Sequence, residues 1–169
     1  MTTDRDSLER LRFLARVVHR ERDHLMATDQ RLFTALFSIE RVRQLDTDAE
    51  LSERVEAFVA RFGRLQDTLG DKLIPALLSS LGERPGAAID NLDRAERLGW
   101  LASADEWMSA RKLRNQMIHE YIEDPTILAS ALQAGHDRVP MLTDAANAML
   151  QELNRRGWVV RVNPECPHA

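Results

Sequence analysis

The sequence predicts an all-α protein, folded as an antiparallel bundle of four to five helices. Apolar residues recur almost everywhere at spacings of three, four and seven, which is the period of amphipathic helices. No pair of segments shows the alternation that would build a convincing sheet. The chain has 169 residues, of which 44% are hydrophobic and 30% are charged, so it can form one domain with a buried core.

A stripe of apolar residues near the N-terminus predicts the first long helix. Its members are Leu8, Leu11, Leu14, Val18, Leu25, Leu32, Leu36 and Ile39. Two interpretations fit this stripe: one continuous helix, or two segments separated near Thr28 and Asp29, which can cap a new helix.

A second stripe predicts another long helix. Its members are Leu51, Val55, Phe58, Val59, Phe62, Leu65, Leu69, Leu73, Leu77 and Leu78. Pro75 should kink this helix, because proline lacks a backbone donor and its ring clashes with the preceding turn. The run from Gly82 to Gly86 contains glycine and proline and predicts a turn.

Two further helices follow the turn. The first is short, covers residues 87–97 and should end at Gly99. Ser103 and Glu106 then match a capping box, in which each side chain satisfies a free backbone donor of the other residue. A helix over about 104–121 is therefore expected.

The dipeptide Asp124-Pro125 should close that helix and open the last one, since proline is favoured in a first helical turn. Gly135 and Pro140 are expected to interrupt the last helix before it resumes and stops at Gly157. We therefore assign residues 1–157 to the bundle and 158–169 to a C-terminal tail. The tail has strand composition but no partner strand, so it is expected to be irregular.

Composition limits the functional classes. The net charge is −4, from 23 basic and 27 acidic residues, which argues against a binder with a wholly basic surface but not against a local phosphate site. Cys166 is the one cysteine, so neither an internal disulfide nor a cysteine-based zinc site can form. The apolar runs are far shorter than a membrane helix, which needs about 20 residues. With a polar, acidic N-terminus, these features predict a cytoplasmic protein without membrane attachment.

Several familiar motifs of chemistry are missing. The sequence has no phosphate-binding P-loop, dinucleotide-binding glycine motif, zincin motif or serine-hydrolase elbow. His19 and His24 are five residues apart, which is not the spacing of a helical metal-binding pair, so we interpret them as solvated surface residues. No cofactor and no metal are expected.

Arg114 is an unusual residue for its position. At about 100° per residue, it falls inside the apolar arc that Trp107, Met117 and Ile118 form on the predicted helix. A permanently charged guanidinium group is costly on such a face unless it meets an acid, a subunit partner or an anion.

Three further polar residues lie near this arginine. Asn115 and His119 are four residues apart and share one edge of the apolar arc, while Tyr121 lies two turns from Arg114 on the same stripe. Arginine can hold a phosphoryl oxygen, and histidine can move protons near neutral pH. This set of side chains suits phosphate chemistry.

A purely structural interpretation stays open beside the catalytic one. Arg114 can form an ion pair in the core, with Asp67 or Asp71 as its partner. His119 can serve only as a favourable charge near the C-terminus of its helix. Tyr121 can be a core residue with a bonded hydroxyl group.

The run from Arg114 through His119 to Tyr121 resembles the Arg-x4–6-His-x-Tyr signature of the HEPN domain family, including the common asparagine directly after the arginine. The likeness is to HepT-like toxins and to the HEPN subunits once called nucleotidyltransferase substrate-binding proteins. It covers most of the chain and includes the segments 64–67 and 120–125.

The resemblance implies a helical bundle that forms a two-fold homodimer, and for many members a metal-independent ribonuclease. Arg114 and His119 would then face their copies across the dimer axis in a composite cleft. On one helix these two residues are about 140° apart and about 7.5 Å apart along the axis. They do not form a compact pair, so a second subunit would be needed to bring another arginine and histidine close to them.

The resemblance also implies roles for the residues. An RNA 2′-hydroxyl would attack its own phosphate, with His119 as general acid or base, Arg114 stabilising the developing charge and Asn115 orienting the phosphate or the imidazole. In similar toxin–antitoxin pairs, a minimal nucleotidyltransferase (MNT) antitoxin adds AMP to the tyrosine of the motif, here Tyr121. The added bulk and negative charge beside Arg114 would block an RNA site.

Three hypotheses follow. The first is a HepT-like toxin of a type II toxin–antitoxin module, an endoribonuclease with RNA as its substrate. The second is a non-catalytic HEPN subunit that binds nucleotide or docks a minimal nucleotidyltransferase. The third is a structural helical protein in which Arg114 serves only as an ion-pair partner.

Overall fold

The prediction of an all-α protein is confirmed. A computed structural model describes residues 4–119 and 124–159, and within these ranges the chain contains helices and loops but no strand. In chain order the helical elements are α1 (Arg5–Leu32), α2 (Ile39–Arg43), the 3₁₀ turn η1 (Gln44–Asp46), α3 (Ala49–Asp67), the π-helical turn η2 (Thr68–Leu73), α4 (Ile74–Ser80), α5 (Ala88–Arg97), α6 (Ala104–His119) and α7 (Pro125–Arg155).

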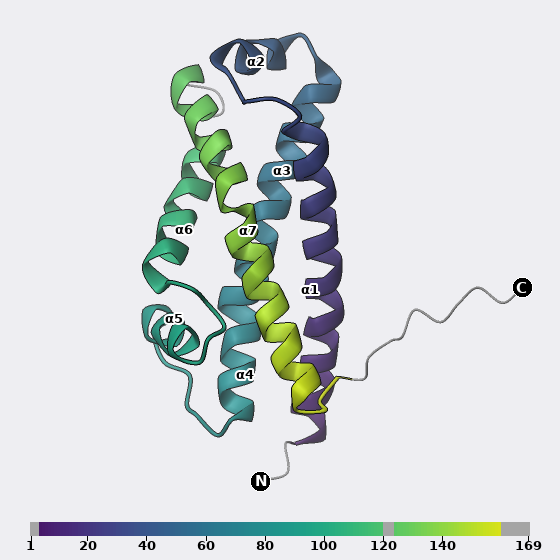
Figure 1. Cartoon of the computed structure of the whole chain (residues 1–169), viewed down its shortest axis with the longest axis vertical. Coiled ribbons are helices and arrows are strands. Elements are labelled where there is room, and N and C mark those ends of the chain that lie inside the picture. The colour runs from purple at the N-terminus through teal and green to yellow at the C-terminus, as the bar shows by residue number, and fades with distance from the viewer. Residues whose placement is uncertain (1–3, 120–123, 160–169) are drawn as a thin grey trace, which may run out of the picture.

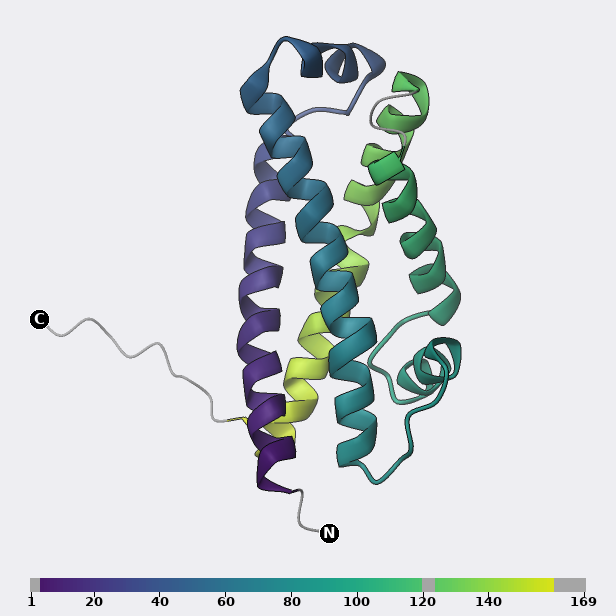
Figure 2. The same ribbon diagram turned by 180° about the vertical axis from the view of Figure 1, so that it is seen from behind.

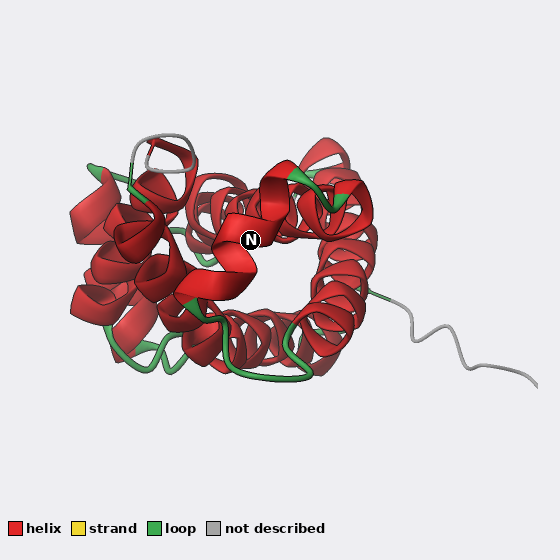
Figure 3. Ribbon diagram, turned by 90° about the horizontal axis from the view of Figure 1, so that it is seen from above, coloured by secondary structure: helices red, strands yellow, loops and turns green. Residues whose placement is uncertain are grey.

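The long helices run side by side as a bundle. α1 packs along α3, and α7 packs against α1, while α6 packs against both α7 and α3 (Figures 1 and 2). The short helix α2 covers one end of the bundle, and α5 lies across its side near α4 and α6. Viewed along the bundle, the long helices surround a common interior (Figure 3).

The interior of the bundle is one continuous apolar cluster. Its largest fully buried side chains are Trp107, Phe58, Phe62, Leu11, Leu25, Leu32, Leu65, Leu69, Leu73, Ile74, Leu77 and Leu78. Every residue of the second predicted stripe is in the core. Because burial of apolar area dominates folding, this stripe sets the rotation of the whole α3–η2–α4 run.

The suggested break in the first helix is wrong. α1 continues without interruption to Leu32. The Thr28 hydroxyl group bonds to a carbonyl of its own preceding turn, and Asp29 accepts a hydrogen bond from His136 at 2.7 Å, so neither side chain caps a new segment. The predicted stripe also ends at Leu32, since Leu36 lies in the following loop and is 77% exposed.

Pro75 disturbs its helix without ending it. Proline cannot donate to the carbonyl of Asp71, four residues earlier, and its ring crowds that carbonyl. The backbone responds with the π-helical turn η2 just before it, in which the Ile74 N–H donates to the Leu69 carbonyl, five residues back. The predicted irregularity is thus present, and α3, η2 and α4 form one continuous run.

The predicted turns and helix starts are confirmed where the structure describes them. Gly82, Gly99 and Gly157 have φ values of 80°, 79° and 68°, a conformation that favours glycine at helix ends. The Ser103 hydroxyl group accepts a hydrogen bond from the Glu106 N–H at 3.2 Å, so half of the expected capping box forms.

The predicted interruption of the last helix is wrong. Asp124 caps α7 as expected and accepts hydrogen bonds from two backbone donors, but the helix then runs unbroken through Gly135 and Pro140. A proline inside a helix costs about 3 kcal/mol. Val139 and Leu142 are buried on either side of it, so tertiary packing offsets this cost.

Gly135 has a packing role instead. A Cβ atom at this position would lie 3.1 Å from Met117 Sδ and 3.3 Å from Phe58 Cε1. The absence of a side chain therefore lets α7 approach both α6 and α3 closely, and it seats Met117 in the core.

Two remaining expectations concern membranes and the tail. Within residues 4–119 and 124–159, none of the helices combines the length and apolarity required to cross a bilayer. Of the tail, Trp158 and Val159 are described, and both pack partly against the core. The Trp158 carbonyl accepts a hydrogen bond from Arg12 at 3.1 Å. Residues 160–169 lie outside the described part.

Candidate functional site

Helix α6 carries the candidate residues on its C-terminal half. Trp107 and Met117 are buried and fix the rotation of the helix against the core. Arg114 is half-buried, whereas Asn115 and His119 are exposed to solvent. Arg114 thus lies nearer the buried face of α6 than Asn115 and His119 do. Tyr121 lies outside the described residues.

Arg114 forms an ion pair with Asp67 of α3. Its Nη1 atom donates to Asp67 Oδ1 at 2.7 Å, and the two side chains are 29% and 36% exposed. The sequence left Asp67 and Asp71 open as partners; the structure pairs Asp71 with Arg111 instead, one turn earlier on α6. The ion pair that the structural interpretation expects is therefore present, but it lies at the surface of the core rather than inside it.

Gly63 makes room for this arginine. A Cβ atom built on Gly63 would lie 2.6 Å from Arg114 Nε, closer than any real contact allows. The arginine side chain therefore lies across the α3 backbone at this glycine and reaches Asp67, one turn further along. A guanidinium group has five N–H donors, so the bond to Asp67 orients the group and leaves other donors available.

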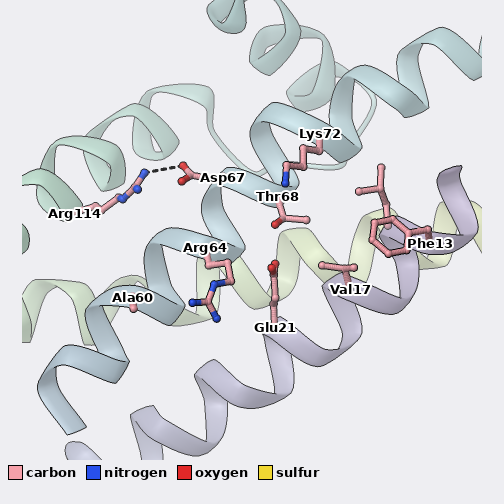
Figure 4. A pocket seen from close by; sticks show the side chains of 10 residues that line it. Phe13, Val17, Glu21, Ala60, Arg64, Asp67, Thr68, Lys72 and Arg114 are labelled. Carbon is pink, nitrogen blue, oxygen red and sulfur yellow. Dashed lines mark hydrogen bonds and ion pairs between the residues drawn. The ribbon is translucent and has the colours of Figure 1, made fainter. Parts of the chain in front are cut away.

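Two open grooves meet at Arg114. The first, which we call the α1–α3 groove, has a volume of about 510 Å³. Arg114 and Asp67 lie at one end of it in Figure 4, and its walls include the side chains of Phe13, Val17, Glu21, Arg64, Thr68 and Lys72.

The second groove, which we call the α3–α6 groove, has a volume of about 380 Å³ and lies on the other side of Arg114. Its walls are mainly apolar and include Val59, Met117 and Ile118, the last of which is 48% exposed. Ile118 was expected on the buried arc of the helix. Its exposure leaves an apolar patch next to the candidate residues.

Glu21 is an unusual carboxylic acid in the α1–α3 groove. Figure 4 shows it pointing from α1 toward Thr68 at the start of η2, with Arg64 to one side of it and Lys72 beyond Thr68. Burial raises its pKa, and this effect outweighs a hydrogen bond with Thr68 and the two positive charges, which lower the pKa. Its Oε2 atom is buried and has no hydrogen-bond partner.

Sequence reasoning missed Glu21 and Gly63, although both leave a signal. Leu14, Val18 and Leu25 follow the alternating three- and four-residue spacing of the α1 stripe, and Glu21 occupies the stripe position between Val18 and Leu25. Gly63 interrupts the apolar stripe of α3, where glycine costs about 1 kcal/mol relative to alanine. A charged residue on a core stripe and a glycine inside a helix both indicate that something other than apolar packing or helix propensity selects the residue.

Two further expectations concern the histidines of α1 and metal ligands. His19 and His24 are exposed on α1, as predicted. In the described part of the chain, no group of three or more histidine, cysteine, aspartate or glutamate side chains is arranged to hold a metal ion.

Comparison with known proteins gives no match: no protein-family model, no curated protein and no solved structure is significantly similar to this chain.

The exposure of the Arg114–Asp67 pair predicts a modest contribution to stability. In a double-mutant cycle with Arg114→Ala and Asp67→Ala, we expect a coupling energy of about 1 kcal/mol, because solvent screens a pair that is about one-third exposed. Chemical denaturation of the four proteins measures it. The same cycle at Arg111 and Asp71 is the matched control. A coupling above about 3 kcal/mol would identify Arg114 as a buried structural residue.

The raised pKa of Glu21 predicts a pH-dependent cost to stability. A carboxylic acid that binds its proton more tightly in the folded state stabilises the fold most in acid, and this contribution is lost as pH rises through the raised pKa. We therefore expect Glu21→Gln to raise the melting temperature by about 1–3 °C at pH 7.5 and by less at pH 4. Glu9→Gln, at an exposed position of α1, is the control. A larger gain at pH 4 than at pH 7.5 would contradict the assignment.

Proposed function

We propose that this protein is a HEPN-like, metal-independent endoribonuclease, and specifically a HepT-like toxin of a type II toxin–antitoxin module. The observation that carries the proposal is the setting of Arg114. Asp67 orients its guanidinium group at the junction of two open grooves, while Asn115 and His119 lie exposed on the same helix. The match of this helix to the family's signature and the all-α fold support the same assignment.

The proposed reaction is an internal transfer within RNA. The 2′-oxygen attacks the adjacent phosphorus, a new 2′-O–P bond forms, and the bond from phosphorus to the 5′-oxygen breaks. One product ends in a cyclic phosphate and the other in a 5′-hydroxyl group. His119 removes the proton from the 2′-hydroxyl group or supplies one to the leaving oxygen. Arg114 stabilises negative charge on the phosphoryl oxygens, and Asn115 orients the phosphate or the imidazole.

A second copy of the chain would complete the site. Arg114 and His119 are five residues apart and diverge around the helix, so one chain supplies them as separated groups. The apolar α3–α6 groove, with the exposed Ile118, offers a surface that a two-fold partner can cover. Such a dimer would bring two sets of Arg114, Asn115 and His119 toward one RNA backbone.

The resemblance to the HEPN family also implies that the protein is regulated by covalent modification. An MNT-type nucleotidyltransferase antitoxin would transfer AMP from ATP to the hydroxyl group of Tyr121, seven residues after Arg114, and release pyrophosphate. The transferred phosphate would compete with RNA for the guanidinium group, because both are anions that arginine binds.

The second candidate function is a non-catalytic HEPN subunit that binds nucleotide or docks a nucleotidyltransferase. The observation that favours it is the ion pair itself, because Asp67 offsets the positive charge that Arg114 would offer to a phosphate. RNA cleavage separates the two candidates.

We expect the purified protein to cleave RNA in excess EDTA. His119→Ala should lower the rate by about 100-fold or more, since a general acid or base contributes about 10²–10⁴-fold. Arg114→Ala should cost about 100-fold or more through lost charge stabilisation. The readout is the initial rate on a labelled single-stranded RNA.

Two matched variants control for indirect effects. Arg111→Ala removes a neighbouring α6 arginine with a comparable ion pair, and His24→Ala removes an exposed histidine far from α6. Both should cleave at close to the wild-type rate. Equal cleavage by wild type and His119→Ala would point to a contaminating nuclease, and no cleavage by any variant would favour the non-catalytic subunit.

A further inference from the structure

The α1–α3 groove contains two cations without ion-pair partners in the described part of the chain. Arg64 and Lys72 both line the groove and are exposed, and the neighbouring carboxylates Asp67 and Asp71 are already paired with arginines of α6. Both cations lower the pKa of Glu21, so each lies within electrostatic range of that carboxyl group. In a chain with a net charge of −4, this concentration of unpaired positive charge favours an anion.

The opposite wall of the groove is apolar and includes an exposed aromatic ring. Phe13 on α1 is 56% exposed, although its neighbours Leu11 and Leu14 are buried in the core. Core packing therefore does not account for this ring. Proteins bind single-stranded nucleic acids with two elements: cations that contact the phosphates of the backbone, and exposed aromatic side chains on which bases stack. The α1–α3 groove has both.

Glu21 offers a polar contact for a base edge. Glu21 Oε2 is buried without a hydrogen-bond partner, and the Glu21 side chain forms part of the groove wall. A rotation of the side chain toward the groove would let an N–H donor of a nucleobase satisfy this oxygen. A paired base has its edge occupied, so this contact, like stacking on Phe13, suits a single strand better than a duplex.

We infer that the α1–α3 groove binds single-stranded RNA, with phosphates on Arg64 and Lys72 and a base stacked on Phe13. This inference rests on the proposed function, in which Arg114 binds a phosphate of RNA. Because the groove ends at Arg114, a strand lying in the groove delivers a phosphate to that residue. Arg64 and Lys72 are eight residues apart on one helical run, about 12 Å along its axis, so they contact different phosphates of the strand.

The test is binding of a fluorescent ten-nucleotide RNA with 2′-O-methyl groups, which lacks the nucleophile and cannot be cleaved by 2′-hydroxyl attack. Anisotropy titrations of the full chain at several salt concentrations give the affinity and its salt slope. Lys72→Ala and Arg64→Ala should each weaken binding about tenfold at low salt and reduce the salt slope by about 0.7, the value for one phosphate contact of a single strand.

Phe13→Ala should also weaken binding about tenfold but leave the salt slope unchanged, because stacking releases no counterions. Two matched controls should bind like wild type: Lys112→Ala on the exposed side of α6, and Met26→Ala, an exposed apolar residue of α1 outside the groove. A duplex of the same sequence should bind more weakly than the single strand.

The outcomes separate this inference from the proposed function. Unchanged salt slopes for Arg64→Ala and Lys72→Ala, or equal losses in the control variants, would overturn the groove assignment even if the protein cleaves RNA. The expected binding pattern in a protein that cleaves no RNA would support the groove while contradicting the ribonuclease. If cleavage occurs, Lys72→Ala should raise KM and leave kcat close to wild type.

Discussion

The ion pair between Arg114 and Asp67 ties the candidate site to the rest of the structure. It joins α6 to α3 across Gly63, whose missing side chain allows the arginine to lie against the helix. Three residues further along the same face of α6, Met117 packs against α7 at Gly135. α6 is therefore held by a polar contact to α3 and an apolar contact to α7. The positions of Asn115, His119 and both grooves follow from that placement, because all of them lie on or beside this helix.

One side chain of the α1–α3 groove is placed at a cost to stability. A carboxylic acid on the α1 core stripe would be replaced in a sequence selected for packing alone. Burial raises the pKa of Glu21, which means that its ionised form is disfavoured in the fold. A residue that weakens the fold and lines an open groove is typical of a binding or catalytic surface. Glu21 therefore supports the proposal that function lies at the α1–α3 groove.

Periodicity and local signals were sufficient to predict the all-α class, the second long helix and the glycine stops, because these depend on contacts close in sequence. They failed where distant packing decides. Pro140 is tolerated because the residues beside it are buried against other helices, and Asp29 binds His136 instead of capping a helix. For the site, helical spacing placed Arg114 on the apolar arc of its helix, where it needs a partner, but spacing could not choose between Asp67 and Asp71. The participation of α1, through Phe13 and Glu21, depends on how α1 packs against α3 and could not be seen in the motif.

The most direct test of the account is the chemical identity of the RNA ends that the wild-type protein produces in excess chelator, measured by mass spectrometry of a defined single-stranded RNA. Attack by the 2′-hydroxyl group, with Arg114 and His119 in the roles proposed, predicts a 2′,3′-cyclic phosphate on one fragment and a 5′-hydroxyl group on the other. Fragments ending in a 3′-hydroxyl and a 5′-phosphate group would contradict this mechanism, because they arise when water, rather than the RNA itself, attacks the phosphate.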